Sequence, residues 1–449
     1  MNYYIQTYGC QMNKSDSERI AAVLESAGWT ACSKEETADL IIVIACSVRQ
    51  TAVDRVYGRA QKYKELKKKN PRLKTLLTGC VLDSDKKKLA DKFDIVCDIG
   101  KISQISNFKF LTCPNDSFRR VSSFSSGRSE HKKINYNYLT IKPKYQSNFQ
   151  AYVPIMTGCN NFCSYCVVPY TRGREYSRPS KDILNEIRRL IKNDYKEIFL
   201  LGQNVNSYND SQNKKNINFP ALLRLINSIP YDFWIRFATS HPKDMTDELI
   251  SAIAECEKIT PYLHLPIQSG SDKILKAMNR KYTKTHYLGL IKKIKARIPN
   301  IMFSTDVIVG FPKETKKDFQ ETVDIFKKVK YTMAYIARYS PRAGTASYGL
   351  KNNVAPEKKA ERENILTKIL KKTALENNKK FIGKTVRVLV ESQTDDYCIG
   401  KTAQFINMKI KSNHSSHSHL SQRGVRGDLI GNFINIKILK ATSFGMEGR

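Results

Sequence analysis

The stretch Cys159-Asn-Asn-Phe-Cys163-Ser-Tyr-Cys166 places three cysteines in the spacing C-x3-C-x2-C. Iron–sulfur clusters are normally held by four Cys thiolates, and no fourth cysteine follows here at short range. Three thiolates this close would hold three irons of one cubane and leave the fourth iron open, as in catalytic rather than structural metal sites. A structural zinc knuckle or a chance grouping of cysteines is the alternative. A zinc knuckle usually pairs two cysteine hooks or adds two histidines, and the next histidine here is His241.

Around this stretch, residues 145–375 alternate strand-like and helix-like patterns, which predicts an open (βα) barrel. Ser180 is a candidate cap for a helix with an apolar face that includes Ile183 and Ile187. Strands are expected at 197–201, 234–238, 262–265 and 302–309. Barrels of this kind carry their chemistry on the loops that follow the strands. The expected strand exits are Cys159, Gly202-Gln203-Asn204, Ser240-His241, Gln268-Ser269-Gly270 and Gly310-Phe311.

Residues 1–113 show a βαβα pattern, which predicts a small parallel α/β domain. Strands are expected at 3–7, 40–44 and 73–78, and helices at 15–27 and 51–69. Cys10, Cys46 and Cys80 each follow one of these strands. Parallel strands bring their carboxyl ends to one edge of the sheet, so the three thiols would meet there as a second metal centre. The alternative is three unrelated buried cysteines, since free Cys is often a core residue.

The remaining segments differ in composition. Residues 114–144 are Ser-rich in part and have no clear period, so we interpret them as a linker. Residues 378–445 contain short β runs at 385–391, 397–405 and 432–440, punctuated by glycines, which predicts a small all-β barrel. Basic residues outnumber acidic ones in it, so it is a candidate RNA-holding module, with a structural cap as the alternative. The residues 412–420, with His414, His417 and His419, are interpreted as a polar loop rather than a metal site.

The whole chain has 449 residues, with 76 Lys and Arg against 42 Asp and Glu, so its net charge is +34. Such a surplus suggests a polyanionic partner, most simply nucleic acid, although compositional drift is the alternative. Eleven cysteines without a secretory signal favour metal binding or catalysis over disulfides. The longest apolar run, Leu40–Cys46, is too short to span a bilayer. We therefore expect a cytoplasmic protein without a membrane partner.

The Cys159, Cys163 and Cys166 motif is the signature of the radical S-adenosylmethionine (SAM) enzymes. Together with the upstream cysteine triplet and the terminal β module, it makes the chain resemble the methylthiotransferases, and within them those acting on N6-(dimethylallyl)adenosine in tRNA. The resemblance covers nearly the whole chain. The strings that carry it are Gln6-Thr-Tyr-Gly-Cys10-Gln-Met-Asn13, Val167-Val-Pro-Tyr-Thr-Arg-Gly173, Leu201-Gly-Gln-Asn-Val-Asn-Ser-Tyr208, Ala238-Thr-Ser-His-Pro242, Leu263-His-Leu-Pro-Ile-Gln-Ser-Gly-Ser271 and Tyr339-Ser-Pro-Arg342.

The resemblance implies an α/β fold with an N-terminal parallel domain, a central partial (βα) barrel of the radical SAM type and a C-terminal TRAM-like barrel. It implies two 4Fe–4S clusters. One, on Cys159, Cys163 and Cys166, would bind and cleave SAM; the other, on Cys10, Cys46 and Cys80, would carry the sulfur. A second SAM would supply the methyl group. The product would be the 2-methylthio derivative of N6-(dimethylallyl)adenosine at tRNA position 37, beside the anticodon. Besides tRNA, the expected partners are an electron donor and a sulfur donor. The protein is expected to be a monomer.

Several further residues are candidates for the site. Gly202, Gln203 and Asn204 are expected to line the cofactor site, with a simple tight turn as the alternative. Asp16 and Glu18 follow the first cysteine and are candidates to face the sulfur centre, but acids at a helix start are common without function. Three arginines are candidates to contact phosphate or carboxylate, or else lie in a solvated loop: Arg172, Arg174 and Arg178. The other cysteines are interpreted as plain thiols: Cys32, Cys97, Cys113, Cys256 and Cys398.

The chain departs from the family pattern at two places. Ile44-Ala45-Cys46 stands where Asn-Thr-Cys is usual, and Lys313 stands where the family usually has Gly. Neither change removes a ligand. Two other functions remain open: a sister methylthiotransferase acting on threonylcarbamoyl-adenosine or on a ribosomal protein, and a non-catalytic iron–sulfur RNA sensor. The sensor would form no 5′-deoxyadenosine on reduction.

Overall fold

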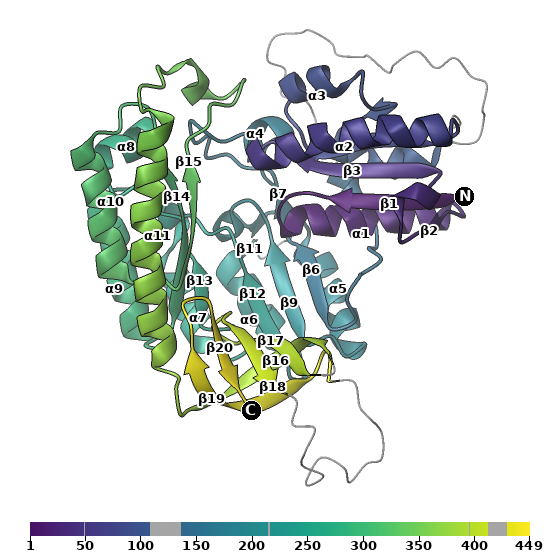
Figure 1. Ribbon diagram of the computed structural model, residues 1–449. Coiled ribbons are helices and arrows are strands. Elements are labelled where there is room, and N and C mark those ends of the chain that lie inside the picture. Colours follow the sequence, from purple (N-terminus) through teal and green to yellow (C-terminus); the bar gives the residue numbers. More distant parts are fainter. Residues whose placement is uncertain (49, 108–135, 214–215, 395, 412–428) are drawn as a thin grey trace.

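The computed structural model describes residues 1–48, 50–107, 136–213, 216–394, 396–411 and 429–449. These residues form an N-terminal α/β unit, a central barrel-like unit and a C-terminal β-barrel (Figure 1). The described part of the N-terminal unit has a parallel sheet in the order β2-β1-β3-β4-β5. Its strands are β1 (Asn2–Thr7), β2 (Thr30–Ala31), β3 (Leu40–Cys46), β4 (Lys74–Cys80) and β5 (Ile95–Val96).

Helices cover both faces of this sheet, as Figure 1 shows for α1 and α2. The helices are α1 (Gln11–Ser26), α2 (Gln50–Lys69) and α3 (Asp83–Leu89). The alternation of side chains along β3 divides its apolar run between the two layers. Ile42 packs with Ile20 of α1, whereas Val43 packs with Val56 of α2. A strand buried on both faces reads as a continuous apolar run, which is why this strand was predictable.

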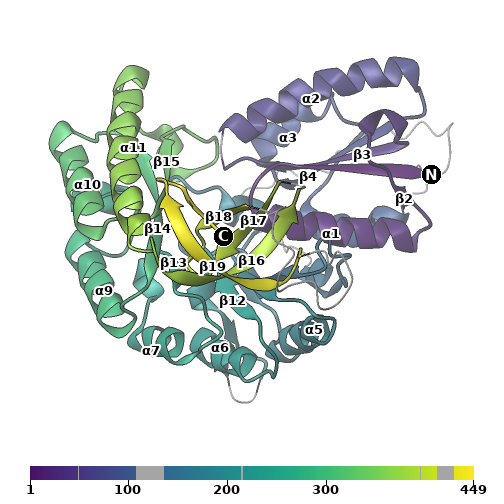
Figure 2. The same cartoon turned by 60° about the horizontal axis from the view of Figure 1, so that its bottom comes forward.

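The central unit is an open barrel of parallel strands with helices outside, as expected (Figures 1 and 2). Its strands pair in the orders β12-β9-β6 and β13-β14-β15. They are β6 (Gln150–Pro154), β9 (Glu197–Leu201), β12 (Trp234–Phe237), β13 (Tyr262–His264), β14 (Met302–Val309) and β15 (Met333–Arg338). The outer helices are α5 (Ser180–Lys192), α6 (Phe219–Asn227), α7 (Asp247–Glu255), α8 (Asp272–Ala277), α9 (Lys284–Arg297), α10 (Lys316–Val329) and α11 (Pro356–Lys379).

The cap prediction for α5 was wrong by one residue. Pro179 is the N-cap, and the Ser180 hydroxyl instead donates to the Asp210 carboxylate at 2.7 Å. The apolar face of the helix is buried as predicted, including Ile183 and Ile187. The same Asp210 oxygen accepts the Ser180 amide at 2.7 Å, so Asp210, and not the Ser180 hydroxyl, satisfies the first amide of the helix.

The C-terminal strands close into a barrel in the order β16-β17-β18-β20-β19, which confirms the all-β prediction. They are β16 (Thr385–Gln393), β17 (Tyr397–Thr402), β18 (Asn407–Lys411), β19 (Phe433–Ala441) and β20 (Gly445–Gly448). The sequence did not predict β18 or β20, and the expected run 397–405 stops early because the chain turns at Phe405, which has φ 65°. The predicted histidine loop lies outside the described residues.

This barrel packs against the amino ends of the central strands. Arg236 donates to the carbonyl oxygens of Thr402 and Ala403 at 2.9 and 2.8 Å and pairs with Glu197, the first residue of β9. Phe405 stacks on Tyr262, the first residue of β13, with ring centroids 5.0 Å apart. The β-barrel lies at one end of the central strands (Figure 1), and the cysteine loops follow the opposite, carboxyl ends of strands.

The described end of the predicted linker is packed against the N-terminal unit. Residues Tyr136–Thr140 form a short 3-10 helix, and Tyr138 and Leu139 are buried in one core cluster with Tyr3 and Ile20. Tyr138 also reaches the central unit, because its hydroxyl donates to the Thr157 hydroxyl at 3.4 Å. This segment therefore helps to join the two α/β units.

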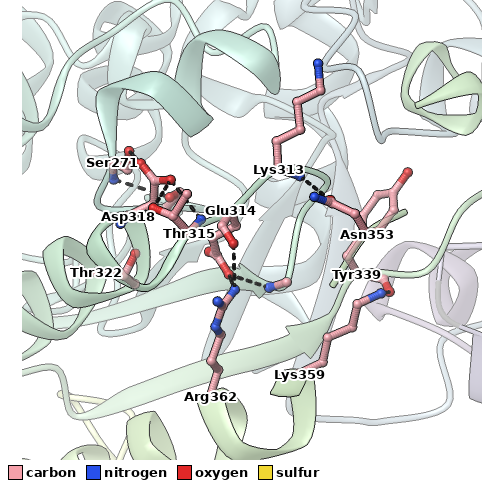
Figure 3. Close-up of polar contacts among 12 residues, drawn as sticks. Ser271, Lys313, Glu314, Thr315, Asp318, Thr322, Tyr339, Asn353, Lys359 and Arg362 are labelled. Carbon is pink, nitrogen blue, oxygen red and sulfur yellow. Dashed lines mark hydrogen bonds and ion pairs between the residues drawn. The ribbon is translucent and has the colours of Figure 1, made fainter. Parts of the chain in front are cut away.

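The loop after β14 is fixed by a buried polar network (Figure 3). A Glu314 carboxylate oxygen accepts the Gly310 amide at 2.7 Å and pairs with Arg362 of α11. Lys359 crosses over Gly310 and donates to the Tyr339 carbonyl at 3.1 Å. A Cβ on Gly310 would meet the Lys359 stem at 2.3 Å, and its φ is 70°. Glycine is therefore required where this strand leaves the barrel.

Lys313 lies in the same loop with φ 67°, a left-handed conformation that a non-glycine residue adopts at a cost. Its side chain is exposed, and its amide donates to Asn353 at 2.8 Å (Figure 3). Lys313→Gly keeps that bond, so we expect it to raise stability by up to about 1 kcal/mol, after the entropic cost of glycine. The thermal unfolding midpoint at one fixed scan rate measures this.

The matched control is Lys368→Gly, at an exposed position in the interior of α11. Glycine there costs about 1 kcal/mol because the residue is helical. If Lys313→Gly lowered the midpoint as much as Lys368→Gly does, backbone strain at Lys313 would be excluded.

Candidate active site

The three N-terminal cysteines meet at one edge of the N-terminal sheet. Cys46 and Cys80 end the adjacent strands β3 and β4 and are paired in register. Cys10 follows β1 as the N-cap of α1. A Cβ on the preceding Gly9 would lie 3.1 Å from Cys46 Cβ, so the Cys10 turn passes directly beside that strand. The structure thus brings together the residues that the sequence pattern grouped.

Arg172 reaches this edge from the central unit. It is 1% exposed, and its Nε donates to Cys80 Sγ at 2.8 Å. One terminal nitrogen donates to Asp16 at 2.5 Å and to Asn13 Oδ1 at 3.1 Å. The other donates to the Tyr138 hydroxyl at 3.2 Å. Arg172 thus contacts a carboxylate, as the sequence allowed, but the carboxylate belongs to the protein, and the Arg172 side chain is buried.

The second triplet, Cys159, Cys163 and Cys166, lies in a loop whose two ends are joined by a short pair of strands. Strand β7 (Met156–Thr157) pairs with β8 (Tyr176–Ser177), and the Cys159 amide donates to the Gly173 carbonyl at 3.1 Å. Cys163 and Cys166 then turn together, since the Cys166 amide donates to the Cys163 carbonyl at 2.9 Å. The short helix α4 (Val168–Thr171) follows and ends at Arg172. Arg172 thus connects the loop of one triplet to the thiol of the other.

The loop is docked on the central unit by residues that follow α8. A terminal nitrogen of Arg280 donates to Cys163 Sγ at 3.4 Å, and the other donates to the Pro266 carbonyl at 3.0 Å. Asn279 donates to the Phe162 carbonyl at 2.8 Å. The Ser164 amide donates to the Met278 carbonyl at 3.0 Å. These bonds hold the cysteines over the open end of the barrel.

The environment of the thiols suits iron–sulfur clusters. Burial raises the pKa of Cys80 to about 12 and also raises the pKa values of Cys159 and Cys166. Ligation by metal supplies the positive charge that ionises such thiols. No three His, Cys, Asp or Glu side chains among the described residues could hold a single metal ion. Three cysteine thiols are a donor set that iron–sulfur clusters use, so each triplet fits such a cluster by the chemistry of its side chains.

The strand exits next to the second triplet carry buried polar atoms without partners among the described residues. They are Gln203 Oε1, Asn204 Oδ1 and Ser240 Oγ. Asn204 is oriented by its amide nitrogen, which donates to Asp244 at 2.7 Å. Orphaned buried polar groups are costly unless a ligand satisfies them, so this edge is suited to a polar cofactor such as SAM. Gly202 packs against Met156, whose Cγ would lie 2.5 Å from a Cβ, so it serves close packing.

The other candidate residues lie elsewhere. Arg178 is buried and donates to Pro154 and Glu186 at 2.6 and 2.7 Å, so it is structural. Arg174 is exposed, with its guanidinium 4.4 Å from the ring centroid of Phe162. Glu18 accepts the Gln146 amide at 3.2 Å in the interface between the two units. Burial raises the pKa of Glu18 to about 7, but the residue does not contact the cysteines through any described bond.

Sequence reasoning missed Asn13 and Arg280, which contact cysteines of the site, and Tyr138, which contacts Arg172 from outside it. Asn13 lies one helical turn after Cys10, and its amide donates to the carbonyls of Tyr8 and Ala45 at 2.7 and 3.1 Å. Because α1 begins at the candidate cluster ligand Cys10, a polar residue one turn further along the helix could have been predicted to face the cysteines. Nothing in the spacing of the sequence connects Tyr138 or Arg280 to the cysteines.

Gly158 sits where two backbone segments cross, with φ 79°. A Cβ there would lie 1.9 Å from the Arg174 carbonyl oxygen, so Gly158→Ala must separate the segments and break the Cys159–Gly173 bond. We expect the anaerobically reconstituted variant to lose the iron held by the second triplet, as measured by iron analysis and visible absorption. The control is Gly289→Ala in α9, where nothing lies within 4 Å of a Cβ. It should keep its iron, and an unchanged iron content in Gly158→Ala would contradict the expectation.

No helix in the described parts of the chain combines the length and apolar character needed to cross a membrane. Residues 153–326 match the Radical SAM superfamily, and residues 2–99 match the Uncharacterized protein family UPF0004. Each match contains one cysteine triplet. The TsrM radical SAM methyltransferase from Kitasatospora setae, solved with cobalamin and a 4Fe–4S cluster, has a similar fold, with a TM-score of 0.53 and 13% identity over 77% of each chain.

Curated relatives match over almost the full length. The tRNA-2-methylthio-N(6)-dimethylallyladenosine synthase of Clostridium novyi (strain NT) is 40% identical over 99% of this chain and 96% of its own. The enzyme of the same name from Carboxydothermus hydrogenoformans is 40% identical over 100% of this chain and 98% of its own. With both cysteine triplets inside the matched regions, this chain belongs to the family of tRNA-2-methylthio-N(6)-dimethylallyladenosine synthases, within the radical SAM superfamily.

Proposed function

We infer that this protein is a tRNA methylthiotransferase that converts N6-(dimethylallyl)adenosine at position 37 to its 2-methylthio derivative. The observation that carries this function is the pair of cysteine triplets on two facing α/β units, connected by Arg172. Sulfur insertion requires one site that activates SAM and another that provides sulfur, and they must lie close together. Near-full-length similarity to synthases of this name supports the substrate.

The cysteines are assigned to two 4Fe–4S clusters. When bound, the clusters and SAM supply the radical that breaks an unactivated ring C–H bond, the sulfur, and the methyl group. Cys159, Cys163 and Cys166 would hold the cluster that binds SAM, and Cys10, Cys46 and Cys80 would hold the auxiliary cluster. The orientation of the two sets is fixed by the protein, through the docked loop and the parallel strands.

The neighbouring residues bind and orient the cofactor. Gln203 and Asn204 offer amide oxygens that can accept hydrogen bonds from the ammonium or ribose hydroxyl groups of SAM. His241 is buried beside Tyr282, and its Nδ1 accepts the Lys243 amide at 3.1 Å. Burial lowers the pKa of His241 to about 2, so its ring is neutral and adds no cation to the site.

A net charge of +34 supports a nucleic-acid partner, because phosphate contacts dominate such affinity. The C-terminal barrel is assigned as a TRAM-like module that contributes to RNA binding. The tRNA substrate supports a cytoplasmic location. We propose that the protein is a monomer, and that its partners are tRNA, an electron donor and a sulfur donor.

The two triplets predict two different losses of function. Cys159→Ala, Cys163→Ala or Cys166→Ala should abolish reductive SAM cleavage and thus 5′-deoxyadenosine. Cys10→Ala, Cys46→Ala or Cys80→Ala should keep the cleavage but abolish methylthiolation, because only the sulfur source is lost. The assay combines reconstituted protein, isopentenylated tRNA, SAM and a strong reductant under anaerobic conditions, with nucleosides identified by mass spectrometry.

The control is Cys32→Ser, outside both triplets, which should keep both products. Cleavage that survives the loss of Cys163 would overturn the assignment of the two sites. Deoxyadenosine without the methylthio product in the wild type would favour a sister substrate, either threonylcarbamoyl-adenosine or a ribosomal protein. Neither product, with intact clusters, would favour the sensor.

A further inference from the structure

In each cysteine triplet, one thiol accepts a hydrogen bond from a buried arginine. Arg172 donates to Cys80 at 2.8 Å and Arg280 donates to Cys163 at 3.4 Å. The two residues are 1% and 8% exposed. A buried guanidinium is costly to desolvate, so its hydrogen bonds must be made in full. Both arginines direct one of their N–H groups at a cysteine sulfur, and this shared feature needs a physical explanation.

The partners of Arg172 come from two units of the chain. Asp16, Asn13 and Cys80 belong to the N-terminal unit, whereas Arg172 follows Cys166 and α4 in the central unit. Asp16 alone would neutralise the guanidinium charge. The Nε–H directed at Cys80 is therefore an additional contact that charge neutralisation does not explain.

The chemistry of sulfur explains this contact. A protonated thiol is a weak acceptor, but a thiolate carries negative charge and accepts a charge-assisted hydrogen bond. A thiolate that ligates an iron–sulfur cluster retains part of that charge. Hydrogen bonds to such sulfurs are among the factors that set the reduction potential of the cluster. The donor stabilises the more negative, reduced form.

We propose that Arg172 is a positioning residue for the auxiliary cluster: its Nε–H bonds to the Cys80 thiolate, raises the reduction potential of that cluster, and ties it to the loop that carries Cys166. The inference rests on the proposed function, because it takes Cys10, Cys46 and Cys80 as ligands. Arg280 has the corresponding relation to Cys163 and to the cluster assigned to Cys159, Cys163 and Cys166. It has no carboxylate partner among the described ion pairs.

The test isolates one cluster at a time in the full-length chain. Cys159→Ala, Cys163→Ala and Cys166→Ala combined leave the auxiliary cluster alone. Into this parent we introduce Arg172→Gln or Arg172→Lys, and reconstitute each protein anaerobically. Iron and sulfide analysis gives the cluster content, and potentiometric titration followed by electron paramagnetic resonance gives the midpoint potential and the spectrum.

We expect Arg172→Gln to shift the midpoint potential to a more negative value at equal iron content. Arg172→Lys should recover part of the shift, since it keeps the charge but not the planar donor. Tyr138→Phe is the matched control. It removes one partner of the same guanidinium, at 3.2 Å, and leaves the bond to Cys80, so the potential should stay unchanged.

A reciprocal parent separates the two clusters. With Cys10→Ala, Cys46→Ala and Cys80→Ala combined, Arg280→Gln should shift the potential of the remaining cluster and Arg172→Gln should not. Because Arg172→Gln leaves Asp16 as a buried unpaired charge, the double variant with Asp16→Asn is measured in parallel. It retains a neutral pair and lacks only the charged donor, so the potential can be compared even if the single variant folds poorly.

The outcomes distinguish this inference from the proposed function. An unchanged potential and spectrum in Arg172→Gln and in the double variant, with the cluster intact, would overturn the role of Arg172 and leave the function standing. If the parent that combines Cys159→Ala, Cys163→Ala and Cys166→Ala held no cluster at all, the assignment of Cys10, Cys46 and Cys80 as ligands would itself be overturned. A potential that moves equally with Tyr138→Phe would show a structural effect and also overturn the proposal.

Discussion

The direction of parallel strands is the constraint on which the site depends. Residues that follow different strands gather at one edge of a sheet, however far apart they are in sequence. The N-terminal sheet uses this edge for Cys46 and Cys80, and the central unit uses its own edge for Gly202 and the loop of Cys159. The two edges face each other, and the buried pair of Arg172 and Asp16 joins them. Loss of either partner leaves a buried charge, which is far costlier than the loss of a surface ion pair.

Much of the fold could be predicted because its buried strands are long and apolar. The expected strands at 197–201 and 302–309 coincide with β9 and β14, and the run starting at Leu40 is β3. The strand β15 was missed because its residues are mixed in burial and give no period. The extra strands β18 and β20 were missed because they are short and form only through pairing with neighbours.

The six cysteines could be assigned from strand exits and spacing, but their surroundings could not. Arg172 lies six residues after Cys166, yet its partner Asp16 is 156 residues away in sequence, and no local pattern carries that relation. The same holds for Arg280 and Cys163, which are 117 residues apart. Composition marked the terminal barrel as basic, but contacts such as Phe405 on Tyr262 decide which end of the core it covers.

The C-terminal β-barrel lies at the end of the core opposite to the cysteines, which sets a minimum length for any ligand that touches both. Strand β14 has eight residues, and at about 3.3 Å per residue it spans roughly 26 Å from the barrel side to the cysteine side. A nucleotide or a very short oligomer fits within one end only. An RNA that contacts both the β-barrel and the cysteine loops must therefore extend along the length of the core strands.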